Sequence, residues 1–253
     1  MKLFVDSSLY FDTSKPIDIS ISLKQEGPHL KAWYLENPEI TPVMENGFVG
    51  SVALGGVVNF RNIFFNPHGH LTHTECLGHI TKEVYSVNKV LDSYFFKAQL
   101  ISVFPEENYN EAYGVKDKVI THEQLQHLEI EKGVEAIVLR TYPNQDEKKA
   151  LNYSDTNPPY LLPEAISFFN QYAIKHLLID LPSVDRESDG GKLLFHHAFW
   201  GVPDNLNFER TITEFVYVDS EIKDGVYILE LQTAPFENDA APSRPILYEL
   251  CEQ

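Results

Sequence analysis

The sequence predicts an α/β protein, with a mixed central β-sheet or a barrel-like sheet flanked by helices. Glu135–Tyr142 and His176–Pro182 are nearly continuous apolar runs, as expected for strands buried on both faces. Between them, residues 162–176 space their apolar side chains as a helix does. Strand, helix and strand in succession are typical of an α/β unit.

Three further runs favour strands. Pro16–Leu23 alternates apolar and polar residues. Thr213–Val218 and Gly225–Phe236 are rich in β-branched and aromatic residues, which suit a pleated, half-buried surface. Glu214 would then lie at the start of a strand.

Two helices have recognisable starts. Thr121 is followed three residues later by Gln124, the spacing of a capping box. In the segment 162–176, Pro163 occupies a plausible first helical position and Glu164 lies in the first turn. No repeat and no composition break interrupts the chain, so we expect a single domain over residues 1–253.

Composition limits the partners. The formal net charge is −17 and no cluster of Lys and Arg is present, which argues against nucleic acid and against an anionic membrane surface. No apolar stretch approaches the roughly 18 residues of a membrane span, and Asp6 interrupts the first apolar run, which makes a poor signal peptide. With only Cys76 and Cys251, a reducing compartment is the simpler expectation. We therefore expect a cytoplasmic protein that binds a small molecule.

The run "NPHGHLTHTECLGHI", residues 66–80, holds four of the ten histidines of the chain. Three explanations compete: a metal site, an acid–base site without metal, or surface histidines without chemistry. If residues 72–76 are extended, His73 and Glu75 project from the same face. An imidazole and a carboxylate so placed can bind one cation, and Zn²⁺ accepts both ligand types.

Local residues rarely complete a metal site. His68 or His70 would reach back from the preceding turn, and His79 would lie in the same pocket without binding the ion. Distant candidates are His196 or His197 in "FHHAFW", and Glu214. Cys76 is more simply a buried free cysteine than a ligand.

At these residues the sequence resembles the putative cyclase family of metal-dependent hydrolases, which includes bacterial kynurenine formamidase and isatin hydrolase. The family motif has the form HxGTHxDxPxH, and the matching run here is His68 to His79. The segment "DLPSVDRESDGGKLLFHHAFW" resembles a later family segment of the form TPS-D … SH, and Glu214 resembles a downstream family glutamate. Pro16–Leu23 is similar to the usual first strand of the family.

The match has departures. Gly69 stands where the family has its first histidine, Glu75 replaces the aspartate, and Leu71 and Leu77 replace a glycine and a proline. These changes indicate a divergent branch.

The resemblance implies a fold of the swivelling β/β/α type and a dimer or tetramer of identical chains. It implies one or two Zn or Mn ions, with Glu75 able to bridge two. The ligands it carries over are His68, His73, Glu75, His196 and Glu214.

By the same resemblance, His79 is the general acid–base residue of an enzyme that cleaves an amide-type C–N bond, as an arylformamidase or a cyclic amidase does. A divalent ion lowers the pKa of water toward about 7 in the case of zinc. His79 would take the proton of that water and give it to the leaving nitrogen, a role that suits the pKa of histidine.

Two rival functions remain open. His73, Glu75 and His196 also fit the ligand triad of a non-haem iron oxygenase. The chain would otherwise be a metal-binding protein of the same fold without turnover.

Overall fold

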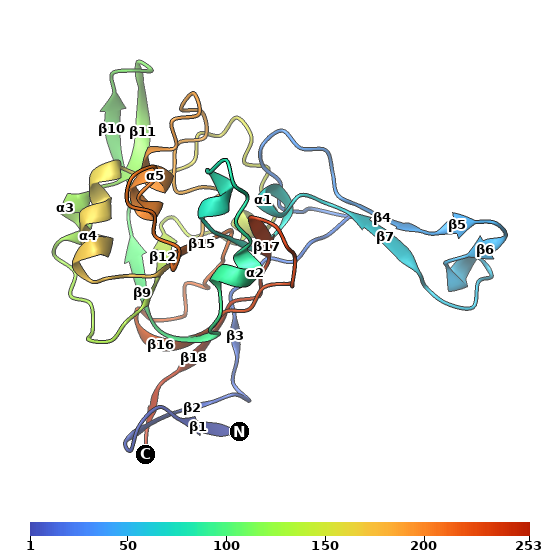
Figure 1. Ribbon diagram of the computed structural model, residues 1–253, viewed down its shortest axis with the longest axis horizontal. Coiled ribbons are helices and arrows are strands. Elements are labelled where there is room, and N and C mark those ends of the chain that lie inside the picture. The colour runs from blue at the N-terminus through green and yellow to red at the C-terminus, as the bar shows by residue number, and fades with distance from the viewer.

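The computed structural model describes residues 1–253 and confirms the α/β class. Its centre is a nine-stranded mixed sheet, curled like half a barrel (Figure 1). The strand order is β17 (Ala240–Pro242), β8 (His73–Glu75), β15 (Thr211–Glu214), β14 (His176–Ile179), β12 (Ala136–Thr141), β9 (Phe95–Val103), β16 (Gly225–Glu230), β18 (Ile246–Glu249) and β3 (Ile17–Asp18).

The four strands β15, β14, β12 and β9 run parallel to one another. Antiparallel strands extend the sheet on both sides, with β8 and β17 beyond β15, and β16, β18 and β3 beyond β9. The strand–helix–strand unit predicted between residues 135 and 182 is confirmed, because β12 and β14 pair in parallel and a helix connects them.

Apolar side chains alternate between the two faces of the parallel strands. Ile137 and Leu177 pack under the helices, while Val138 and Leu178 belong to the core on the opposite face. The covering helices are α3 (His122–Leu125), α4 (Ile166–Gln171), α5 (Leu194–Trp200) and the 3₁₀ turn η4 (Pro163–Ala165). Each buried aliphatic side chain contributes about 1.5–3 kcal/mol to stability, and the resulting rigid sheet carries the site residues described below.

Several elements are shorter than the sequence pattern predicts. The capping box of Thr121 and Gln124 is present, yet α3 has one turn. The helix predicted over 162–176 ends by Gln171, and Ala173 has a positive φ of 52°. Of Pro16–Leu23, only Ile17–Asp18 forms a strand.

The position of Glu214 corrects the prediction. It lies at the end of β15, since the strand begins at Thr211, and Phe215 has a left-handed φ of 58° that ends the extended run. Residues 215–218 are therefore outside the strand.

A long hairpin arm, residues 39–64, projects from the body (Figure 1). No pattern in the sequence predicted this arm. Its strands are β4 (Glu39–Pro42) with β7 (Arg61–Phe64) and β5 (Met44–Glu45) with β6 (Phe48–Val49), and its tip carries the 3₁₀ turn η1 (Val52–Leu54).

Two small sheets and four short turns complete the chain. The termini meet in the sheet of β1 (Lys2–Phe4), β2 (Leu9–Asp12) and β19 (Cys251–Glu252), and the other sheet holds β10 (Glu106–Asn110), β11 (Val115–Ile120) and β13 (Tyr160–Leu161). The remaining turns are α1 (Pro67–His70), η2 (Leu77–His79), α2 (Val87–Val90) and η3 (Asp146–Ala150). None of the helices is both long and apolar enough to span a membrane.

Candidate metal centre

Strand β8 places two site residues on one face of the sheet. His73 and Glu75 are both fully buried, and His73 Nε2 lies 4.0 Å from Glu75 Oε2. Thr74, between them, points to the other face, where its hydroxyl meets that of Thr213 at 2.8 Å. The alternation expected of an extended segment is therefore confirmed.

Strand β15 brings Glu214 to the same place. In the antiparallel register of β8 and β15, Glu214 lies opposite His73. His73 Nε2 and Glu214 Oε2 are 3.4 Å apart. Directly opposed residues on a sheet share a face. The pairing therefore brings His73 next to Glu214, although the two residues are 141 positions apart in the sequence.

The turn α1 supplies His68 and not His70. Asn66 caps this turn and Pro67 is its first residue, as suits a helix start. His68 Nδ1 lies 3.1 Å from Glu75 Oε2. His70 points elsewhere, with Nε2 at 2.9 Å from the carbonyl oxygen of Glu36.

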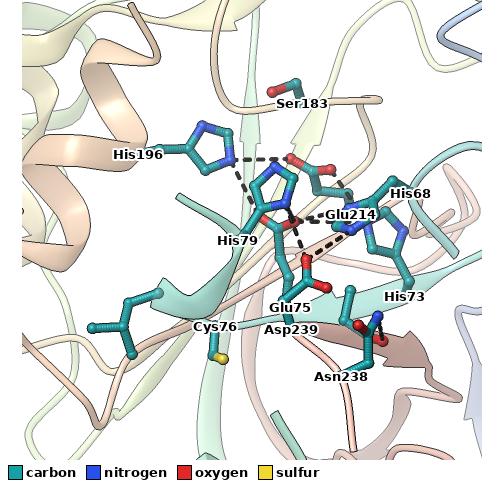
Figure 2. A network of polar contacts seen from close by, with 12 residues as sticks. His68, His73, Glu75, Cys76, His79, Ser183, His196, Glu214, Asn238 and Asp239 are labelled. Carbon is teal, nitrogen blue, oxygen red and sulfur yellow. Dashed lines mark hydrogen bonds and ion pairs between the residues drawn. The ribbon is translucent and has the colours of Figure 1, made fainter. Parts of the chain in front are cut away.

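His79 ends the 3₁₀ turn η2 and lies over Glu75. Its Nδ1 is 3.8 Å from Glu75 Oε2, and its side chain is 29% exposed. Gly78 makes this turn possible, since a Cβ there would meet the backbone of Tyr85 at 2.2 Å. Cys76 Sγ bonds the Tyr85 carbonyl oxygen at 3.2 Å and lies apart from the cluster (Figure 2).

Helix α5 supplies His196. Its Nε2 lies 3.1 Å from Glu75 Oε1, and its Nδ1 lies 2.6 Å from Asp185 Oδ2. Asp185 also accepts the backbone N–H groups of Phe195 and His196 at the start of the helix. His197 makes none of these contacts, so the structure brings the first histidine of the pair into the cluster.

Glu75 is the centre of the cluster (Figure 2). Two donor sets have all ligand atoms within 4.8 Å of one another, and both include Glu75: His68 with Glu75 and His79, and His73 with Glu75 and Glu214. His73 Nε2 and Glu75 Oε2 are buried without a hydrogen-bond partner. Buried polar atoms without a hydrogen-bond partner destabilise the folded protein. A cation between these two atoms would supply the partner that both lack.

Electrostatics agree with a site built for positive charge. Burial lowers the pKa of His73 to about 3. Burial and then the charge of Glu75 raise the pKa of Glu214 to about 8. Burial therefore favours the neutral form of both groups, and a cation would favour ionised Glu214.

His68 and His196, by contrast, have raised pKa values that favour their protonated forms. Burial lowers the pKa of His68, but the neighbouring carboxylates of Asp239 and Glu75 outweigh burial and raise it to about 10. For His196, burial is likewise outweighed by Asp185 and Glu75, which raise the pKa to about 10. Metal binding would release these protons, because a ligating imidazole must be neutral.

Asp239 is a site residue that sequence reasoning missed. Its Oδ2 lies 3.0 Å from His68 Nε2 and 3.2 Å from His79 Nδ1. It precedes β17 in a stretch without histidine or a recognisable motif, so no local signal marks it.

The cluster opens into a cavity of about 300 Å³, the lower end of the range for small-molecule sites. Its wall combines site residues with apolar side chains: Trp33, Leu35, Asn66, His68, His79, Ser183, Leu193, His196 and Glu214. The indole Nε1–H of Trp33 donates to the carbonyl oxygen of His68 at 2.8 Å, which ties the apolar wall to the turn α1.

Comparison with known proteins identifies a family and a shared fold. The model of the putative cyclase family matches residues 17–186. No curated protein matches the chain.

Solved structures share the fold. An isatin hydrolase A from Ralstonia solanacearum superposes with a TM-score of 0.64 at 14% identity, over 94% of this chain and 92% of its own. A predicted metal-dependent hydrolase from Bacillus stearothermophilus gives 0.62 at 15% identity, over 92% of this chain and 98% of its own. An isatin hydrolase bound to the product analogue thioisatinate gives 0.62 at 16% identity, over 94% and 93%.

Proposed function

The chain belongs to the putative cyclase family, and from this we propose that it is a metal-dependent hydrolase that cleaves an amide-type C–N bond with water. The observation that carries the proposal is the position of Glu75, whose two carboxylate oxygens face His68, His73, His79 and His196. A buried carboxylate among four imidazoles, with two polar atoms that lack hydrogen-bond partners, would destabilise an apolar core. The same groups are suited to bind a cation.

The metal would be held by nitrogen and oxygen donors only: His68, His73, Glu75, His196 and Glu214. This donor set suits Zn²⁺ or Mn²⁺, and Glu75 is placed to serve one or two ions. A bound divalent cation supplies Lewis-acid chemistry, making water more acidic and stabilising negative charge that develops on a carbonyl oxygen.

The protein's own residues supply orientation and proton transfer. Asp185 accepts from His196 Nδ1 and turns Nε2 toward Glu75. His79 lines the cavity and is the group we assign to accept the proton of water and to donate it to the leaving nitrogen. Trp33 and Leu35 offer an apolar wall, which favours a small substrate with a flat or apolar part.

Similar proteins guide the choice of substrate class. Two of the structures of similar fold are described as isatin hydrolases, one of them bound to a product analogue. We therefore propose N-formylated aryl amines and cyclic amides as the first substrates to test.

The test is elemental analysis of protein purified without added metal, followed by hydrolysis assays on those substrates. We expect zinc or manganese at one or two equivalents and turnover that chelation abolishes. Full metal occupancy without turnover on amides, lactams and lactones would instead favour a metal-binding role. Turnover that requires O₂ would favour the oxygenase with His73, Glu75 and His196 as ligands.

We also propose that the protein is a homo-oligomer, a dimer or a tetramer. The hairpin arm supports this, because residues 46–60 contain no charged side chain and many apolar ones are exposed. A two-stranded ribbon is marginal in water by itself, and a patch of this kind usually marks an interface.

A further inference from the structure

We propose that Asp239 is a positioning residue that fixes where His68 and His79 carry their protons. It would thereby make His68 a metal ligand through Nδ1 and His79 a base through Nε2. The inference rests on the proposed function and deepens it, since it separates the ligand from the base among two histidines that lie side by side. Their ring centroids are 4.4 Å apart.

One carboxylate oxygen serves both rings. Asp239 Oδ2 lies 3.0 Å from His68 Nε2 and 3.2 Å from His79 Nδ1 (Figure 2). The side chain is only 17% exposed. A partly buried carboxylate that contacts two imidazoles can influence where both rings carry their protons.

The backbone holds Asp239 in place independently of its side chain. Its carbonyl oxygen accepts the N–H of Cys76 at 3.0 Å, and the next residue, Ala240, pairs with Glu75 in the sheet. The main chain at Asp239 is therefore fixed relative to Glu75. Asp239 lies outside residues 17–186, the part that matches the family.

The proton positions follow from hydrogen-bond chemistry. An ionised carboxylate only accepts hydrogen bonds, so the ring nitrogen that faces it must carry a proton. By this rule both nitrogens of His68 carry a proton while no cation is bound, since Nδ1 faces Glu75 Oε2 at 3.1 Å. When a cation displaces the Nδ1 proton, Asp239 holds the remaining proton on Nε2 and the Nδ1 lone pair is free to bind the cation. A cation bound there would have a histidine whose second nitrogen is held by a carboxylate, an arrangement typical of metal sites.

In neutral His79 the same rule gives the opposite tautomer. Its proton is on Nδ1, which faces Asp239, so the lone pair is on Nε2. His79 Nδ1 is also its nearest nitrogen to Glu75, at 3.8 Å. Asp239 therefore keeps His79 from ligating through Nδ1 and leaves Nε2 available to take a proton.

Asp239 itself is not placed as a ligand. Its Oδ2 is already engaged by two N–H groups.

The direct test is a long-range ¹H–¹⁵N correlation spectrum of the imidazoles in zinc-loaded protein, because tautomers have distinct nitrogen shifts and need no turnover to be seen. We expect the Nδ1–H tautomer for His79 in the wild type and the Nε2–H tautomer in Asp239→Ala. In that variant we expect zinc affinity to fall roughly 10–100-fold and kcat to fall with a smaller change in KM. Asp239→Asn keeps an acceptor oxygen, so it should recover part of the zinc affinity and part of kcat.

Glu237→Ala is the matched control, since Glu237 is an acid two residues away that is bonded to Asn88 and Lys89 at the surface. It should leave the spectrum, zinc affinity and kcat unchanged, and thermal unfolding confirms that each variant folds. A zinc-loaded wild type with His79 protonated at Nε2 would overturn the role of Asp239 alone. Loss of zinc in Asp239→Ala as complete as in His73→Ala would make Asp239 a ligand and overturn it too. A wild type that binds no zinc would overturn the proposed function together with this inference.

Discussion

Glu75 Oε1 lies 3.1 Å from His196 Nε2, although 121 positions in sequence separate the two residues. Both side chains are almost completely buried. Burying charged groups costs several kcal/mol unless other charges and bonds offset it. We interpret the contact as part of a site whose remaining charge a divalent cation supplies.

The two neighbouring histidines of α5 give a matched pair of variants. His196→Ala should lower metal affinity by at least 10–100-fold, the effect of losing a ligand or its support, because His196 contacts Glu75 and His197 does not. His197→Ala should leave the affinity within about twofold. Competition titrations with a chromophoric chelator measure both, and equal losses in the two variants would remove His196 from the ligand set.

His79→Ala should reduce kcat by roughly 10²–10⁴-fold, as expected when a general acid–base group is lost. Metal content should hold, because His79 is assigned to proton transfer. Steady-state kinetics and elemental analysis of the same preparation measure the two quantities. A variant that has lost its metal would show that His79 is a ligand.

Acid stability should depend on His176, a buried histidine outside the metal cluster. Burial and then the charge of Lys175 lower its pKa to about 3. Since unfolded histidine titrates near pH 6.5, the unfolded state binds the additional proton between about pH 6.5 and 3. Stability is therefore lost as pH falls through this window, by about 2–3 kcal/mol from pH 6.5 to 4.5.

Urea unfolding of wild type and His176→Asn at pH 6.5 and 4.5 tests this. The variant should lose less stability than the wild type over the same pH interval. Both proteins have the same metal site, so the contribution of that site cancels when the two losses are subtracted. His127→Asn, which changes an exposed histidine, is the control and should behave as the wild type does. Parallel pH profiles of wild type and His176→Asn would rule the interpretation out.

The hairpin arm should control the oligomeric state. Leu54 and Val57 are 64% and 89% exposed, so aspartate at both positions should cost the single chain little stability. We expect light scattering to give the mass of a dimer or tetramer for the wild type and of a monomer for Leu54→Asp with Val57→Asp. Val5→Asp, also at an exposed apolar position, should keep the wild-type mass. A monomeric wild type would contradict the proposal.

Sequence reasoning singled out those candidate residues whose signal is local. His68, His73, Glu75 and His79 stand in one run, and the period-two alternation of a strand correctly placed His73 and Glu75 on one face. The preference for His68 over His70 depended on where the turn α1 points, and of the two only His68 contacts Glu75.

Other features depend on tertiary structure. Asp239 reaches the cluster because β17 pairs with β8, a partnership that no spacing in the sequence encodes. The end of β15 at Glu214 depends on the left-handed backbone of Phe215, an aromatic residue that normally favours a strand. The hairpin arm lacked a strong signal because β7 is exposed throughout and β4 alternates over only four residues that are at most half-buried, so neither strand has the long apolar pattern of a core strand.

The most direct test of the metal site is the metal content of wild type and His73→Ala, purified side by side without added metal and measured by mass spectrometry. His73 Nε2 is fully buried, has no hydrogen-bond partner and faces both Glu75 and Glu214, so we expect its loss to affect the metal directly. We expect one or two equivalents of zinc or manganese in the wild type and an empty site in the folded variant. Equal metal content in the two proteins, or none in the wild type, would contradict a cation centre at these residues.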